Sequence, residues 1–407
     1  MGAAAAYRDV LGHRPFAVFW GGFSLSVAGD AMTRVALTWF VFETTQSAVA
    51  VGWLTFFYTA PVVVGGLVAG WLLDRFDRRL IMMIDSLFKA GVVVSVPLLA
   101  AAGWLEVWHA YVVAALYGLM LMVPLAGTPA LLPDLVAPDR LNTANALETL
   151  AYTLSSVIGP PIAGVLIAQW NAPAVLYIDA ATFLLFAAAL AMVRVGSAAS
   201  TDDTSPHERA NRGLGAAFRL LLSNPILLST TAMYMSANIA IGAVLVWLPI
   251  YASRELHGGA ELYGLLLGII AVGEIAGSLL AGLDRLRLPL GTLICAAQFT
   301  SGLALAVLLA DTSIALTVLC LILYGALTAP LTIWAQTLRM KIIPERQRGR
   351  TFALLRMLMQ STNPLGGLLA GFLVPAIGMA WVIAISAAAI GLPGAFGYRV
   401  GALRRAD

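Results

Sequence analysis

The chain has few of the side chains that catalytic and metal sites require. It contains 2 cysteines and 4 histidines among 407 residues, and Cys295 and Cys320 both stand inside apolar runs. Disulfide frameworks and metal clusters need several such residues at defined spacings. The sequence also has no Gly-rich phosphate loop and no nucleophile beside a plausible base. We therefore expect no enzyme activity, no metal and no cofactor.

Charge is scarce as well. Charged residues make up 11% of the chain, 60% of the residues are hydrophobic, and the mean hydropathy is +0.88. Soluble domains carry about 25% charged residues, so water is not the main solvent of this protein. The apolar runs lack the two-residue alternation of a β-barrel. Runs of about 20 residues instead favour helices that each cross a lipid bilayer.

Twelve such runs can be assigned, which predicts an all-α membrane protein. They cover residues 15–42, 47–73, 80–102, 107–132, 143–169, 173–195, 224–252, 261–283, 288–310, 313–338, 351–377 and 379–400. A polar stretch, 196–219, follows the sixth run and is interpreted as a cytosolic linker. We expect a six-helix bundle over 1–195 and a second over 220–407.

The basic residues gather in the loops on one side of these spans. Those loops hold the arginines near both termini and Arg75, Arg78 and Arg79, together with Arg339 and Lys341. The opposite loops hold Arg254 alone. Cytosolic loops of membrane proteins are rich in Lys and Arg. The asymmetry predicts cytosolic termini and an even number of spans, and it accounts for the net charge of +3 without nucleic acid as a partner.

The two halves of the chain repeat each other weakly. Leu73-Asp74-Arg75 recurs as Leu283-Asp284-Arg285, and Pro138-Asp139-Arg140 recurs as Pro344-Glu345-Arg346. The offsets of about 210 and about 206 residues are each about half of the chain. A six-span unit duplicated in parallel orientation explains them. Two such bundles can enclose a midplane cavity and expose it alternately to the two sides.

Two motifs resemble those of a known family. Gly70, Asp74, Arg75, Arg78 and Arg79 give the spacing Gly-x-x-x-Asp-Arg-x-x-Arg-Arg. This resembles the loop between helices two and three of the major facilitator superfamily, which usually has a glycine where this chain has Asp77. The "DRxxRR" form is similar to the branch that exports drugs and siderophores. The segment with Gly159, Pro160, Pro161 and Gly164 resembles the Gly-Pro-x-x-Gly-Gly antiporter motif of drug exporters, with Ala163 in place of a glycine.

The resemblance implies a role for the charged loop. Asp74 would meet the positive N-terminal end of the eleventh helix, and Arg78 would bridge to Asp134 in a neighbouring loop. Together with Gly70, Arg75 and Arg79, these residues would form a latch that closes the cytoplasmic side.

Some charged residues lie inside the predicted spans, where each costs about 2.5–3.5 kcal/mol at the bilayer centre. Asp30 and Arg34 are one helical turn apart in the first span. They are either an ion pair that holds helices together or a proton-coupling carboxylate with its partner. Glu274 lies near the middle of the eighth span and has no basic neighbour in sequence.

Further charged residues lie nearer the predicted span ends. Glu148 and Asp179 are candidates for the cavity, with hydrated boundary positions as the alternative. Arg356 either contacts substrate or captures Asp74 or a helix end. The Asp85–Lys89 pair is expected to stabilise the cytosolic end of the third span.

These observations predict a monomeric transporter of the cytoplasmic membrane. It would exchange protons, with sodium as a possible alternative, for a small amphipathic organic substrate. A lysophospholipid carrier, suggested by Gly29-Asp30 and Asn145-Ala146-Leu147-Glu148, and a siderophore exporter remain alternatives. A membrane receptor or scaffold without transport is a further alternative, against which the mid-span charges argue.

Overall fold

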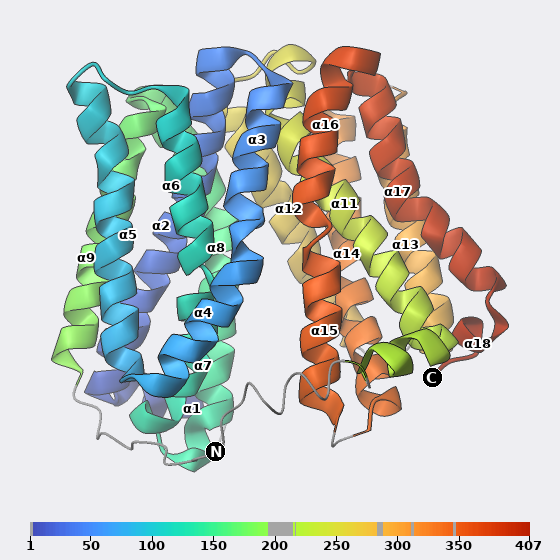
Figure 1. Ribbon diagram of the computed structural model, residues 1–407, viewed down its shortest axis with the longest axis horizontal. Coiled ribbons are helices and arrows are strands. Elements are labelled where there is room, and N and C mark those ends of the chain that lie inside the picture. Colours follow the sequence, from blue (N-terminus) through green and yellow to red (C-terminus); the bar gives the residue numbers. More distant parts are fainter. Residues whose placement is uncertain (1–2, 194–214, 216, 283–287, 311–312, 345–346) are drawn as a thin grey trace. The chain divides into compact units, whose positions relative to one another are not determined.

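The chain is almost wholly helical. The computed structural model describes residues 3–193, 215, 217–282, 288–310, 313–344 and 347–407, and within these ranges no strand occurs. Figure 1 shows the helices as long, nearly straight segments. The all-α fold expected from the sequence is confirmed.

The helices of the first half alternate between long and interrupted spans. Their bounds are α1 (Ala3–Gly12), α2 (Arg14–Thr45), α3 (Ala48–Thr59), α4 (Pro61–Arg75), α5 (Arg78–Ala101), α6 (Val107–Met120), α7 (Met122–Leu135), the short 3₁₀ helix η1 (Pro138–Arg140), α8 (Leu141–Gln169) and α9 (Ala172–Met192). α3 with α4 and α6 with α7 each form one predicted span. Pro61, which has no amide N–H to donate, stands at the first of these breaks.

In the described part of the second half, one predicted span is interrupted. Its described helices are α11 (Pro225–Arg254), α12 (Ala260–Ala281), α13 (Leu290–Val307), α14 (Ile314–Ile342), α15 (Arg348–Gln360), α16 (Asn363–Ile377), α17 (Met379–Arg399) and α18 (Gly401–Arg404). Eleven helices of the described part are long and apolar enough to cross a membrane. α15 and α16 together make up the remaining predicted span, 351–377. Pro364 at the start of α16 explains their separation, because proline has no N–H to donate to the carbonyl of Gln360, the last residue of α15.

The described residues form two compact units. The first unit comprises the described residues within Met1–Gln46, Phe57–Thr201 and Gly258–Gly268. The second unit comprises the described residues within Ser47–Phe56, Asp202–His257 and Ile269–Asp407. The predicted bundles, 1–195 and 220–407, differ from these units at two short segments. The linker 196–219 lies mostly outside the described residues, so its boundaries stay predictions.

In the first unit, α2 is the central helix. It packs on α8 and α9, and α5 packs on α9. An aromatic group fills the core between α2 and α9: the rings of Phe19 and Phe23 each lie within 6 Å of Phe186, at 5.8 and 5.9 Å. In the second unit, α11 packs on α16 and α17, and α13 on α14 and α17.

One arginine expected in a cytosolic loop lies inside a helix instead. Arg339 belongs to α14 and is 2% exposed. Its Nη2 donates to the carbonyl oxygen of Thr230 in α11 at 3.1 Å, and its guanidinium lies 5.6 Å from the ring centre of Tyr234. The hydropathy pattern ended this span at residue 338, four residues before α14 ends at Ile342. The positive charge therefore joins α14 to α11.

The charged loop between α4 and α5 is held by its own side chains. Asp77 is the N-cap of α5, and its carboxylate accepts a hydrogen bond from the amide of Leu80 at 2.8 Å. Its φ of −56° is one that any L residue adopts. Asp77 thus fits the turn as a helix cap and does not need the conformational freedom of the usual glycine.

The loop arginines bind carbonyl oxygens of neighbouring helices. Arg78 donates to the carbonyl of Ala130 in α7 at 2.9 Å. Arg79 donates to the carbonyls of Leu190 and Ala191 at 2.5 and 2.7 Å. Those two carbonyls are among the last of α9, where intrahelical donors are missing and a cation is favoured. The two arginines therefore hold the loop against α7 and α9.

Asp77→Ala is expected to lower the free energy of unfolding by about 1 kcal/mol, because it removes the N-cap of α5. The loss would appear as a lower midpoint in thermal unfolding of the purified protein. Asp77→Asn keeps the acceptor and should retain most of the stability. Equal losses in both variants would mean that the carboxylate does something other than cap the helix.

Candidate functional site

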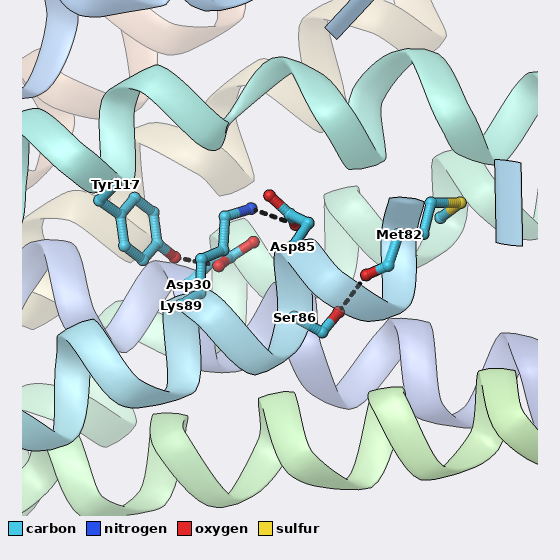
Figure 2. A network of polar contacts seen from close by, with 6 residues as sticks. All are labelled: Asp30, Met82, Asp85, Ser86, Lys89 and Tyr117. Carbon is cyan, nitrogen blue, oxygen red and sulfur yellow. Dashed lines mark hydrogen bonds and ion pairs between the residues drawn. The ribbon is translucent and has the colours of Figure 1, made fainter. Parts of the chain in front are cut away.

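A group of charged side chains lies in the interior of the first unit. Asp30 is near the middle of α2, and the hydroxyl of Tyr117 in α6 donates to its Oδ1 (Figure 2). Arg34, one turn further along α2, forms no ion pair with Asp30, and its Nε is buried without a hydrogen-bond partner in the structure. The local ion-pair alternative for Asp30 and Arg34 is therefore not realised.

Lys89 and Asp85 form the buried ion pair of this group. Lys89 Nζ lies 3.0 Å from Asp85 Oδ2, and the two side chains are 1% and 5% exposed. The ammonium also lies 5.5 Å from the ring centre of Tyr117 and 5.7 Å from that of Phe183. Figure 2 shows the pair on the side of α5 that faces Asp30 and Tyr117. The expectation that this pair stabilises a helix end was wrong, because it lies in the interior beside Asp30.

Asp179 on α9 completes the group. Its side chain is 0% exposed, so it is not the hydrated boundary residue that the sequence left open. The hydroxyl of Thr33 in α2 donates to Oδ2, and the hydroxyl of Thr182 lies 3.1 Å from Oδ1. Gly29 makes room for this contact, because a Cβ there would lie 3.0 Å from Asp179 Cγ and overlap its Oδ1.

Gly29→Ala is expected to push Asp179 and Thr182 away from α2 and to destabilise the first unit. Gly21→Ala is a matched control in the same helix, because a Cβ on Gly21 would meet no atom within 4 Å. The control should be neutral or slightly stabilising, since alanine is the better helix former. Thermal unfolding of both purified variants checks this. Equal midpoints would contradict the close packing of α2 on α9.

Glu148 on α8 is half-buried and lies apart from this group. The indole of Trp20 in α2 donates to the carbonyl of the neighbouring Leu147 at 2.8 Å, and the ring of Tyr152 packs against Phe23 at 5.4 Å. Glu148 is thus at the level of Trp20, ten residues or about 15 Å along α2 from Asp30.

The remaining candidates lie elsewhere. Glu274 on α12 and Arg356 on α15 are exposed and belong to the second unit. Asp74, Arg75 and Asp134 are exposed at helix ends, and a Cβ on Gly70 would meet no atom within 4 Å. Arg78 binds the carbonyl of Ala130 and not Asp134. The latch and the roles of Glu274 and Arg356 stay predictions.

The antiporter-like segment packs closely within the first unit. α8 continues through Pro160 and Pro161 without a break. A Cβ on Gly159 would lie 2.7 Å from the Cβ of Ala31 in α2, and one on Gly164 would lie 2.5 Å from the carbonyl oxygen of Ala260. The small residues therefore allow close helix contact.

Sequence reasoning missed two members of the cluster, Tyr117 and Thr33, and assigned the Asp85–Lys89 pair to a helix end instead of to the cluster. A lysine inside an apolar run is costly wherever it lies, and this cost was the signal for an interior role of Lys89. Thr33 and Tyr117 gave no such signal, since both residue types are common in membrane helices. In the part of the chain that the structure describes, no group of His, Cys, Asp or Glu is placed to hold a metal ion.

Comparison with known proteins decides the family. A major facilitator family model, described as "Transmembrane secretion effector", matches residues 8–407. The chain belongs to the major facilitator superfamily of transporters. It is therefore a multi-pass membrane protein that acts as a transporter and not as an enzyme. The family assignment made from the charged loop is confirmed.

Relatives within the superfamily include drug exporters. The chain is 27% identical over 365 residues to the multidrug efflux pump Tap of Mycolicibacterium fortuitum, covering 86% of this chain and 87% of Tap. It is 25% identical to macrolide efflux protein A of Streptococcus pyogenes, covering 89% and 90%. The crystal structure of the nucleoside transporter NupG superposes with a TM-score of 0.79 at 14% identity, covering 95% of this chain and 99% of NupG. The twelve-helix major facilitator fold accounts for this likeness.

Proposed function

We propose that this chain exports amphipathic organic compounds across the cytoplasmic membrane in exchange for protons, with both termini in the cytosol. The observation that carries the proposal is the buried cluster around Asp30. A carboxylate inside an apolar bundle is costly, and acids in such positions characterise proton pathways. The functions for which the efflux relatives are named support the direction and the substrate class.

Asp30 is suited to bind and release a proton during the transport cycle. Its side chain is partly exposed, whereas Asp85, Lys89 and Asp179 are buried. Protonation would remove a charge from the apolar interior and so change the relative free energies of the two states of an alternating-access cycle. Release of the proton on the opposite side would complete the exchange.

The experiment is substrate accumulation in inverted membrane vesicles. A panel of cationic drugs, macrolides, lysophospholipids and siderophores would be offered under an imposed proton gradient and, separately, a sodium gradient. The proposal expects proton-driven accumulation of amphipathic drugs that a protonophore abolishes. Accumulation driven by sodium, or confined to lysophospholipids or siderophores, would favour the corresponding alternative. Absence of flux for every class, in vesicles that contain the folded protein, would favour a receptor or scaffold.

A further inference from the structure

The buried cluster of the first unit contains more acids than bases. Its acids are Asp30 on α2, Asp85 on α5 and Asp179 on α9, which accepts from Thr33 of α2. Its cations are Arg34, one turn from Asp30, and Lys89, which pairs with Asp85 and lies against the ring of Tyr117, the donor to Asp30. With all five groups ionised, the cluster would carry one net negative charge inside an apolar helix bundle. Buried charge that is not compensated is strongly disfavoured. One bound proton makes the cluster neutral.

We propose that these five side chains bind one exchangeable proton as a unit, shared among Asp30, Asp85 and Asp179 with Lys89 as their common counter-charge. The proposal rests on the proposed proton coupling and extends it, because it makes coupling a property of the whole cluster. Asp30 is then the partly exposed member through which the proton enters or leaves.

Lys89 occupies the central position in this arrangement. Its ammonium pairs with Asp85 at 3.0 Å and lies 5.5 Å from the ring centre of Tyr117, whose hydroxyl donates to Asp30. The side chain is 1% exposed and lies against the rings of Tyr117 and Phe183, so water contributes little to its solvation. A lysine in this setting needs carboxylates around it to remain charged.

The hydrogen bonds of the three acids differ in a way that allows a proton to be shared. Asp30 accepts from Tyr117, and Asp179 accepts from Thr33. Asp85 uses Oδ2 for Lys89, whereas its Oδ1 is buried and has no hydrogen-bond partner in the structure. A buried carboxylate oxygen without a donor is unfavourable. A proton can bind there without displacing an existing hydrogen bond.

The other titratable groups that face the cluster do not change the charge count. They are phenols: Tyr58, Tyr117 on α6, Tyr152 on α8, and Tyr263 at the start of α12. Phenols are ordinarily neutral near pH 7. Glu148 lies at the level of Trp20, ten residues along α2 from Asp30, and is outside the cluster.

The proposal makes a counting prediction for variants. Removing any one acid, as in Asp85→Asn or Asp179→Asn, leaves two acids and two cations, and no proton is needed. Removing Lys89 alone, as in Lys89→Met, leaves three acids and one cation, which need two protons. The double variant Asp179→Asn/Lys89→Met leaves two acids and one cation and restores one proton.

Infrared difference spectroscopy between each variant and the wild type, on purified protein in nanodiscs at neutral pH, measures the change in the number of protonated carboxyl groups. These groups absorb at a different frequency from carboxylates. Relative to the wild type, the carboxyl band should lose one carboxyl in Asp179→Asn and Asp85→Asn, gain one in Lys89→Met, and stay unchanged in the double variant. Glu43→Gln, at an exposed position of α2, should leave the band unchanged. Thermal unfolding confirms that each compared variant is folded.

The outcomes separate this proposal from the proposed function. If Asp179→Asn and Asp85→Asn keep the band and Asp30→Asn alone removes it, the proton belongs to Asp30 and sharing is refuted. A wild type without the band at neutral pH also overturns the proposal. If the bands follow the count while a proton gradient drives no transport, the shared proton stands and the proposed function fails.

Discussion

Asp30→Asn is expected to abolish proton-driven accumulation of substrate while the protein stays folded and inserted. Asparagine keeps the size and polarity of the side chain, and the hydroxyl of Tyr117 can still donate to its amide oxygen. It cannot bind and release a proton. One pH unit of gradient is worth about 1.4 kcal/mol, or about a tenfold accumulation for one proton per substrate. In the variant the accumulation ratio should fall to about one.

The matched control for Asp30→Asn is Glu43→Gln. Glu43 is an exposed acid near the C-terminal end of the same helix, so its substitution tests loss of a carboxylate outside the cluster. Both variants would be measured in inverted vesicles at equal protein content. Unchanged pH dependence in Asp30→Asn would remove Asp30 from the coupling step.

Lys89→Met is expected to lower the free energy of unfolding by about 3–5 kcal/mol near neutral pH, because Asp85 loses its cation and the folded protein must hold an extra proton that the unfolded chain releases. The loss should shrink as the pH falls, since the unfolded chain then binds that proton as well. Thermal unfolding of the purified variant over a pH series measures both effects. A loss that does not depend on pH would point to lost packing against Tyr117 and Phe183.

The double variant Asp85→Asn/Lys89→Met separates the charge from the packing. It removes both partners of the ion pair, so no unpaired charge remains at α5, and it should recover most of the stability lost in Lys89→Met. Lys341→Met, at an exposed position of α14, is the surface control and should change stability by less than about 0.5 kcal/mol. Equal losses in the single and double variants would contradict a buried ion pair.

Much of the fold follows from hydropathy. The apolar runs predicted the spans because a membrane requires long helices whose backbone groups are satisfied internally. The break between α15 and α16 was less visible, although Pro364 marks it. Arg339 was assigned to a loop because charge was taken as a boundary. In the structure, a carbonyl of α11 and the ring of Tyr234 surround it inside α14.

The candidate site was predicted in part. Asp30 stood out because no solvent-exposed end of a span was near it. The relation of Asp85 and Lys89 to Asp30 depends on how α5 packs beside α2 and α9, which sequence spacing within one helix does not contain. Asp179 was placed too near a span end, and Gly29 shows why it is buried: the missing side chain lets α9 approach α2. Such contacts between helices distant in sequence are a tertiary property.

The most direct test of the account is the dependence of substrate accumulation on an imposed pH gradient in proteoliposomes of the purified protein, with the membrane potential held at zero. For exchange of one proton per substrate, the logarithm of the accumulation ratio should rise by about one for each pH unit. The same plot for Asp30→Asn should be flat. A wild-type ratio that stays constant across pH gradients, or that follows a sodium gradient instead, would contradict proton-coupled export.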